Sequence, residues 1–337
     1  MVRSVLFSLA AGLLLVAFGE DASPPEQGAC DFFFYVSADP QINVPEWGLA
    51  GLDTMVATMN RTPGREWPFG GRVDTPWGVI VPGDLVDDID HSQNWDAHKK
   101  YFDPEGNATL HFPVFAGIGN HDLSDSTAQQ FSYVERAHTQ QNKQRPAPLN
   151  LGPKGYHYSW DWSGIHFVCL NIFPGTEARP VYGNPAPWND PKNALAFLKR
   201  DLAEEVGQSD RPVILFWHYG LRVWGLEKWW TEEDPATLKS ALAGYDVVLI
   251  LHGHEHRCER YEWAGYDIVM GPAPYSPGEG PDAESTPKGF LVLRATPDSL
   301  QMAHHGPRGW EDTWAKPLEA KTSPAQETTA AGPRPGR

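Results

Sequence analysis

The sequence predicts an α/β protein in which a pair of mixed β-sheets is flanked by helices. Three observations predict this fold class. Short apolar runs alternate with amphipathic segments, the longest apolar runs lack regular polar alternation, and other runs form pairs joined by short turns. A chain of 337 residues with 41% hydrophobic residues can fill one large α/β domain or two modest ones.

Five apolar runs have the length and composition of strands that are buried on both faces of a sheet. They are residues 32–38, 77–81, 113–118, 213–217 and 247–251. Apolar residues at helical spacing predict helices over residues 94–102, 126–138, 191–206 and 231–243. In the third of these, Asp190 is expected to cap the helix and Pro191 to occupy its first position.

Three further pairs of runs indicate antiparallel hairpins. Residues 156–162 pair with 165–173 through a turn at Ser163 and Gly164, residues 260–263 with 266–270, and residues 289–294 with 300–304. Antiparallel hairpins beside buried strands favour mixed sheets rather than purely parallel ones. We therefore expect one folded domain over residues 30–310.

Both ends of the chain differ from this pattern. Residues 1–19 are typical of a signal peptide, with Arg3 before an apolar run over residues 5–18 and small residues at Ala17 and Gly19. A short membrane anchor is the alternative, but the run is shorter than the ~20 residues that span a bilayer. Residues 20–29 are a predicted linker, and residues 311–337 a predicted disordered tail. The expected location is secreted or periplasmic, without stable membrane insertion after cleavage.

The formal net charge of −16 limits the class of partner. Nucleic acid is not expected, because its binding depends on phosphate neutralisation by Lys and Arg. A small anionic substrate remains compatible with this charge where bound metal ions reverse the local field. No protein partner is predicted. Cys169 lies in an apolar run and is expected to be a buried free thiol, while export would permit a Cys30–Cys258 disulfide.

Polar clusters follow all five buried runs. In order they are Asp39-Pro40-Gln41, Gly83-Asp84-Leu85-Val86-Asp87, Gly119-Asn120-His121-Asp122, His218, and Gly253-His254-Glu255-His256. Open α/β sheets place their ligands at such strand ends. Asp, Asn and His together offer the oxygen and nitrogen donors that suit Mn, Fe or Zn. The glycines are expected to let the chain turn sharply as it leaves each strand.

These blocks resemble the calcineurin-like metallophosphoesterase superfamily, whose pattern is D-x-H, G-D-x-x-D, G-N-H-[DE], H and G-H-x-H. The blocks occur in the right order between residues 31 and 258, and four of the five match fully. The resemblance implies an α/β/β/α sandwich. It also implies a hydrolase that cleaves phosphate esters with two metal ions, Mn, Fe or Zn.

The resemblance also implies a role for each residue. Asp84 would bridge the two ions, Asp39 and His256 would bind the first, and the second would be bound by Asn120, His218 and His254. A hydroxide held between the ions would attack phosphorus in line with the leaving oxygen. His121 would stabilise the transition state or protonate the leaving group, and Asp87 would accept a hydrogen bond from His121.

One position departs from the family pattern. The first block ends in Gln41 where the family has His. An amide oxygen is a weaker ligand than an imidazole, so Gln41 is expected to bind weakly or through a water. We expect a looser first site that favours a harder ion such as Mn.

The sequence leaves three functions open. A phosphomonoesterase is preferred, and a phosphodiesterase for cyclic nucleotides, glycerophosphodiesters or lipid head groups shares the same blocks. The third is a catalytically silent metal-binding scaffold, in which Gln41 marks the loss of one site. His121 argues against the scaffold, because the family assigns it no metal. Four tryptophans near the predicted site are expected to be packing anchors more than a substrate wall: Trp188, Trp224, Trp229 and Trp230.

Overall fold

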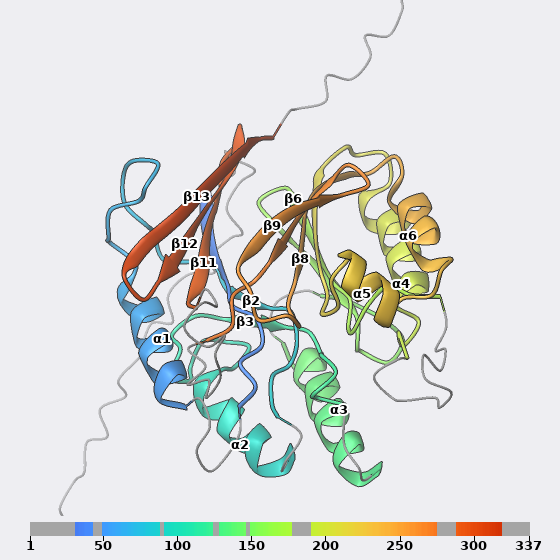
Figure 1. The fold of residues 1–337 in the computed structure, drawn as a ribbon, viewed down its shortest axis with the longest axis horizontal. Coiled ribbons are helices and arrows are strands. Elements are labelled where there is room, and N and C mark those ends of the chain that lie inside the picture. Colours follow the sequence, from blue (N-terminus) through green and yellow to red (C-terminus); the bar gives the residue numbers. More distant parts are fainter. Residues whose placement is uncertain are drawn as a thin grey trace, which may run out of the picture.

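The computed structural model describes residues 31–42, 49–87, 91–123, 128–145, 149–176, 190–274 and 288–318, and it contains two mixed sheets (Figure 1). In the first sheet the strand order is β13-β12-β11-β1-β2-β3. Its parallel half is β1 (Phe32–Val36), β2 (Val79–Val81) and β3 (Val114–Ala116). Its antiparallel half is β11 (Phe290–Ala295), β12 (Ser299–Gly306) and β13 (Gly309–Pro317).

The second sheet has the order β4-β5-β6-β7-β8-β10-β9. Its parallel centre is β6 (Ile165–Cys169), β7 (Pro212–Phe216), β8 (Asp246–His252) and β10 (Tyr266–Met270). The antiparallel strands are β4 (Asn150–Leu151), β5 (Tyr158–Trp162) and β9 (Glu259–Trp263). All five predicted buried runs and all three predicted hairpins are therefore strands of these two sheets.

Helices cover the outer face of each sheet (Figure 1). The first sheet packs against α1 (Leu49–Arg61), α2 (His91–Tyr101) and α3 (Ala128–Lys143). The second packs against α4 (Ala194–Asp201), which continues as the π-helical turn η2 (Leu202–Val206), and against α6 (Asp234–Leu242), with the short α5 (Val223–Lys228) nearby.

Alternation along β1 shows why four layers form. Phe33 and Tyr35 belong to the core beneath α1 and α2, whereas Phe32 and Phe34 belong to the core between the two sheets, where Phe167 of β6 lies 5.5 Å from Phe34 between ring centroids. Side chains of a strand point alternately to its two faces, so both faces of β1 are buried. The predicted α/β/β/α sandwich is confirmed.

The predicted start of the helix at residue 191 is wrong. The helix begins at Ala194, and Lys192 and Asn193 before it have positive φ angles of 55° and 63°. Asp190 does not cap the helix: its Oδ1 accepts a hydrogen bond from the Lys192 backbone N–H at 2.8 Å. A short side chain that bonds the backbone two residues on forms a turn, which here delays the helix.

The predicted disorder from residue 311 is wrong for residues 311–318. Strand β13 continues to Pro317 and pairs along β12, with Trp314 opposite Met302. Trp314 packs against the core between the sheets, which anchors a strand whose other side chains are mostly polar. Residues 1–30 and 319–337 lie outside the described residues, and with them the predicted signal peptide, the linker and Cys30.

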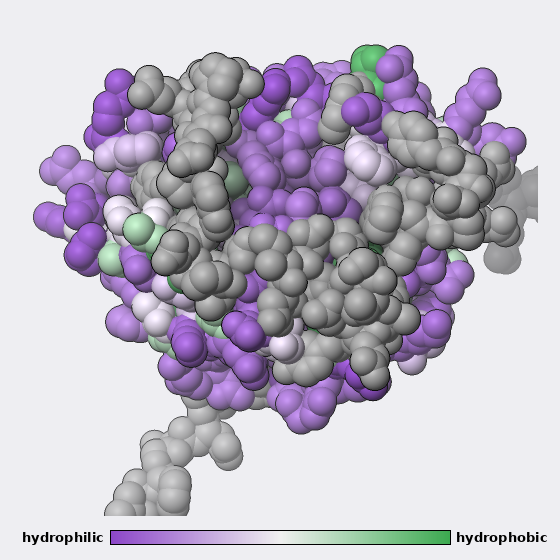
Figure 2. Space-filling view, turned by 60° about the horizontal axis from the view of Figure 1, so that its bottom comes forward, coloured by the Kyte–Doolittle hydropathy of each residue, from purple (hydrophilic) through white to green (hydrophobic). Residues whose placement is uncertain are grey.

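Three further observations concern the helices, the surface and one cysteine. Among the described residues no helix is both long enough and apolar enough to cross a bilayer. The described surface in Figure 2 is mostly hydrophilic, with apolar residues only scattered across it. Cys169 is buried, as predicted.

Candidate metal centre

The polar blocks of the sequence meet where the parallel strands of the two sheets end. Asp39, Asp84 and Asn120 follow β1, β2 and β3 of the first sheet. His218 follows β7 of the second sheet, and the loop with His254 follows β8. The carboxyl ends of parallel strands form one edge of a sheet, so each sheet delivers its polar residues to one place.

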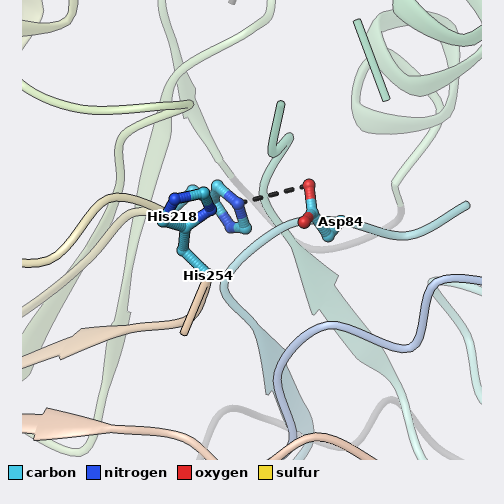
Figure 3. A group of neighbouring side chains, drawn as sticks. All are labelled: Asp84, His218 and His254. Atoms are coloured by element: carbon cyan, nitrogen blue, oxygen red, sulfur yellow. Dashed lines mark ion pairs between the residues drawn. The ribbon is translucent and has the colours of Figure 1, made fainter. Parts of the chain in front are cut away.

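Two groups of potential metal ligands result, and they share one carboxylate. Asp84, His218 and His254 form one group, and Asp39, Asp84 and His256 form the other, with the ligand atoms of each group within 4.8 Å of one another. In Figure 3 a dashed line joins the His218 ring to Asp84, with His218 Nε2 3.2 Å from Asp84 Oδ1, and the His254 ring meets that of His218 edge-on with centroids 5.0 Å apart. Both groups lie close together, since His218 Nδ1 is also 3.7 Å from Asp39 Oδ1.

The two amide side chains lie against these groups. Asn120 Oδ1 is 2.9 Å from His218 Nε2, which places Asn120 in the group that the resemblance assigned to it. Gln41 Nε2 donates to Asp84 Oδ2 at 3.4 Å, and the Gln41 backbone N–H donates to the Asp84 carbonyl at 2.8 Å. Gln41 therefore faces the shared carboxylate.

Backbone strain is concentrated in this site. Five of its non-glycine residues have positive φ angles: Asp39 (51°), Gln41 (38°), Asp84 (53°), His254 (77°) and His256 (56°). Such angles are uncommon outside glycine and persist where the surroundings fix them. At His254 a hydrogen bond fixes the backbone, because the His254 N–H donates to both carboxylate oxygens of Asp39, at 2.8 and 3.0 Å.

The glycines of the blocks allow the backbone to approach neighbouring side chains closely, more than they allow sharp turns. Only Gly83 has a positive φ, 113°. A Cβ on Gly119 would lie within 3.0 Å of the Asp84 carboxylate, the Asp84 backbone nitrogen and the His218 ring, and one on Gly253 would lie 2.8 Å from Asp39 Oδ2. Loss of these glycines would displace the carboxylates.

Burial and neighbouring charges shift the pKa values of Asp39, Asp84 and His254. Asp39 and Asp84 are 3% and 1% exposed. Burial raises the pKa of Asp39, although His256 and His218 oppose the rise. Burial would also raise the pKa of Asp84, but the charge of His218 and its hydrogen bond outweigh burial and lower it. Burial, followed by the charge of His218, lowers the pKa of His254 to about 3.

The donor set fits a pair of divalent or trivalent ions. Two buried carboxylates close together repel each other and need a cation, since a buried charge is costly without one. His254 is neutral at neutral pH, which is the state in which imidazole binds a metal. Oxygen and nitrogen donors together suit Mn, Fe or Zn more than Ca or Mg. The residues present therefore fit the two-metal requirement that the sequence predicts.

His121 and Asp87 lie at the solvent side of the site. His121 Nδ1 is 3.3 Å from Asp87 Oδ1, and the side chains are 32% and 27% exposed. The His121 backbone N–H donates to Asp84 Oδ1 at 2.9 Å, so this histidine also fixes the shared carboxylate. The structure therefore places His121 and Asp87 together beside the candidate metal ligands.

Asp122 is a supporting residue without a role in the sequence analysis, although it is the last residue of the G-N-H-D block. It is fully buried and accepts hydrogen bonds from the Val86 N–H at 3.0 Å and the Gly119 N–H at 2.8 Å. Burial, and then the charge of Asp84, raise the pKa of Asp122 to about 7. Asp122 ties the loop after β2 to the loop after β3.

Aromatic residues pack around His254. Tyr219 stacks on Trp229 with ring centroids 4.9 Å apart, and both rings meet His254 edge-on, at 4.8 and 5.4 Å. Trp230 is buried and donates to the Gly220 carbonyl at 3.0 Å. Trp230 is thus a packing anchor, whereas Trp229 borders a candidate ligand. Trp188 and the side chain of Trp224 lie outside the described residues.

His252 is buried and supports the loop after β8. Its Nδ1 is 2.8 Å from the Gly253 carbonyl, and its Nε2 is 2.8 Å from the Tyr261 hydroxyl. Burial lowers the pKa of His252 to about 4. A neutral ring held at both nitrogens fixes the strand end that carries His254.

Solved structures with a similar fold include the following two. A dimetal phosphatase from Danio rerio shares 13% identity, the alignment covers 84% of this chain and 98% of that one, and the TM-score is 0.55. GAP50, the anchor in the inner membrane complex of Plasmodium, also shares 13% identity, with 87% and 90% covered and a TM-score of 0.53. At these identities the likeness concerns the fold. No curated protein sequence matches the chain.

A family model provides the decisive comparison. The model described as calcineurin-like phosphoesterase matches residues 50–258, which is more than half of the chain. The match begins after Asp39 and Gln41, so the place of the first block in the site rests on the contacts of Asp39 and Gln41 with His254 and Asp84. The geometry and the match agree, and the chain belongs to the calcineurin-like phosphoesterase family, whose members are hydrolases of phosphoester bonds.

Proposed function

We propose that the protein hydrolyses phosphate monoesters at two metal ions. Asp39, Asp84 and His256 would hold the first ion, and the second would be held by Asp84, Asn120, His218 and His254. Gln41 would contribute weakly or through a water. The observation that supports this proposal most is the sharing of Asp84 by both ligand groups.

The two ions, when bound, activate a water for attack and neutralise the phosphoryl oxygens. The chain's own contribution to the chemistry is a proton at His121. Asp87 Oδ1 faces His121 Nδ1, so it would hold the proton on that nitrogen and orient the ring. Nε2 is then the atom that donates a proton to the leaving oxygen, and the partly exposed ring regains it from solvent.

Charge favours monoesters over diesters. A monoester dianion carries one more negative charge than a diester, so two cations stabilise its binding more strongly. The phosphodiesterase alternative uses the same residues and differs in the second ester group, which the site would then have to accommodate.

The test combines metal content with hydrolysis of two esters by one purified sample. Hydrolysis of p-nitrophenyl phosphate and of bis-p-nitrophenyl phosphate is measured with Mn, Fe, Zn and Mg in turn. Two bound ions and faster monoester turnover are expected. Faster diester turnover would replace the monoesterase by the phosphodiesterase. Bound metal with no turnover of either ester under any ion would favour the silent scaffold that Gln41 suggests.

We further propose that the protein is exported. The support is the sequence of residues 1–19, which has the composition of a signal peptide. Expression of the full chain with N-terminal sequencing of the product outside the cytoplasm tests this proposal. Cleavage near residue 20 is expected, and an intact product retained in the cytoplasm would contradict it.

A further inference from the structure

A cavity of about 570 Å³ lies beside the candidate metal centre. It is lined by Arg222, Val223, Glu255 and Arg257. Glu255 stands between His254 and His256 in the chain, and Arg257 follows His256, so two lining residues are direct chain neighbours of candidate ligands. A substrate whose phosphate lies at the ions would have its organic part within reach of this cavity.

Arg222 is held in place at one wall of the cavity. Its Nη1 donates to Glu259 Oε2 at 2.5 Å, and its guanidinium carbon lies 5.5 Å from the centre of the Tyr261 ring. The Tyr261 hydroxyl accepts a hydrogen bond from the Leu221 N–H at 3.0 Å and so fixes the ring. A guanidinium has five N–H donors, so the bond to Glu259 leaves donors for a ligand.

Arg257 supplies a second guanidinium, whose charge acts on the Glu255 carboxylate of the same cavity without an ion pair between them. Its side chain is exposed, and it makes no hydrogen bond or ion pair with any other residue that the structure describes. The chain as a whole carries a net charge of −16, so two arginines beside the centre depart from the average surface. Paired guanidiniums bind carboxylates and phosphates through charge-assisted hydrogen bonds.

The remaining wall of the cavity has both a polar and an apolar group. Glu255 Oε1 is buried and has no hydrogen-bond partner in the described part of the chain, so it can accept a bond from a ligand hydroxyl or ammonium. Val223 is 71% exposed and offers apolar contact. The cavity thus complements a small organic group that carries an oxyanion next to a hydrogen-bond donor.

We propose that this cavity binds a second oxyanionic group of the substrate, a carboxylate or a second phosphate, on the organic part of the ester. The proposal rests on the proposed phosphoesterase function and names its substrate class. Arg257 is the main determinant, because Arg222 shares its charge with Glu259. Preferred substrates are then phosphate esters of hydroxy acids or amino acids, or bisphosphates.

Matched esters test this specificity. O-phosphoserine and phosphoethanolamine differ only in a carboxylate, and glucose 1,6-bisphosphate and glucose 6-phosphate differ only in a second phosphate. Phosphate release by the metal-loaded protein should show a KM about tenfold lower for the doubly anionic member of at least one pair, since a charge-assisted hydrogen bond contributes about that much. The pair that responds identifies the group. Equal KM values within both pairs would overturn the proposal.

Variants then assign the effect to the cavity. Arg257→Gln should raise the KM for the preferred doubly anionic ester about tenfold and leave the KM for its singly anionic partner within twofold. Arg260→Gln is the matched control, since Arg260 is an exposed arginine on β9 that faces Trp314 at 5.5 Å. An equal effect of the two variants, or an equal effect of Arg257→Gln on both esters, would overturn the assignment.

A binding measurement separates this inference from the proposed function. Calorimetric titration of the metal-loaded protein with O-phosphoserine and with glucose 1,6-bisphosphate needs no turnover. If no ester is hydrolysed but Arg257→Gln weakens binding about tenfold, the hydrolase is wrong and the oxyanion site stands. If esters are hydrolysed without discrimination, the hydrolase stands and the oxyanion site is wrong. No turnover together with no effect of the variant overturns both.

Discussion

At the scale of single residues, exposure separates the three most buried candidate ligands from His121, whereas Asn120, His254 and His256 are half-buried like His121. The side chains of Asp39, Asp84 and His218 are 0%, 1% and 0% exposed, whereas that of His121 is 32% exposed. Groups that hold ions gain from burial, because a low dielectric strengthens their attraction to the cation. A group that exchanges a proton with solvent must keep a path to water. The proposed roles of these four residues follow this division.

Replacement of His121 tests the proton-transfer role. His121→Ala should lower kcat about 100-fold or more, which is typical for loss of a general acid, while two ions remain bound. Turnover of p-nitrophenyl phosphate and metal content are measured on the same sample. His111→Ala is the control, since His111 is exposed and belongs to no block. Unchanged kcat would remove His121 from the mechanism.

The substitution Gln41→His introduces the residue of the family pattern and tests the departure in the first block. Gln41 faces Asp84, so an imidazole at this position should reach the first ion and tighten its binding about tenfold. Competition with a chelator of known affinity measures the change. Equal affinity in the two proteins would show that position 41 does not contribute to the site.

At the scale of elements, the loop after β3 depends on the absence of a side chain at Gly119. Gly119→Ala should destabilise the protein by about 2 kcal/mol and weaken metal binding, because its Cβ would displace Asp84. Gly117→Ala is the matched control on the same loop, where a Cβ meets Cys169 Sγ at an ordinary 3.5 Å. Urea unfolding of both variants measures the difference, and equal destabilisation would contradict the close-approach argument.

A buried charge network joins α4 to the second sheet. His166 of β6 lies between Asp161 of β5, at 2.7 Å, and Asp201 at the end of α4, at 2.8 Å. Ser159 and Asn150 also donate to Asp201, at 2.5 and 2.6 Å. Burial would lower the pKa of His166, but its bonds to both carboxylates outweigh burial and raise it. The imidazolium is therefore the form that the fold stabilises.

This network predicts a pH dependence of stability. The folded-state pKa of His166 lies above its unfolded value of 6.5, so its contribution is complete below that pH and is lost as pH rises through the folded pKa. His166→Gln should lower the free energy of unfolding by about 3 kcal/mol at pH 6 and by less at pH 9. Urea unfolding across this range measures the difference, with the exposed His111→Gln as control. A difference that stays constant with pH would exclude the titration.

An element could be predicted from the sequence when its own residues carry a clear apolar pattern. It could not when contacts with distant segments decide its structure. The buried strands could be predicted because continuous apolar runs such as that of β8 exclude other elements. Helix α1 could not, since Gly51, Thr54 and Thr58 weaken its helical signal and its burial against the first sheet decides the outcome. Strand β13 has only Trp310 and Trp314 as large apolar residues, so its polar composition indicated disorder.

In the site, too, features set by local sequence could be predicted, and features set by tertiary contacts could not. The meeting of the polar blocks at one place could be predicted, because each block is contiguous in sequence and follows an apolar run. The bonds of Asp122 to two loops, the packing of Tyr219 on His254, and the Arg222–Arg257 cavity could not be predicted, because each joins segments that only the folded sheets bring together.

At the scale of the whole molecule, bound metal should stabilise the fold. Ions that bind only the folded state add about 2.7 kcal/mol when present at 100 times their Kd, which corresponds to a rise in Tm of about 5 °C for a domain of this size. Thermal melting with a chelator and after addition of Mn measures the shift. Asp84→Asn is the control, because loss of the shared ligand should abolish the shift. Equal Tm values in the wild-type protein with and without metal would contradict the two-ion site.

The hydrogen bond from His254 to Asp39 joins residues that are 215 positions apart in the chain, one from each sheet. The candidate site is therefore complete only in a molecule whose two sheets are packed against each other, because each sheet supplies part of it. Hydrolytic activity would thus report assembly of the whole sandwich, and each active molecule would be one in which both sheets are packed together.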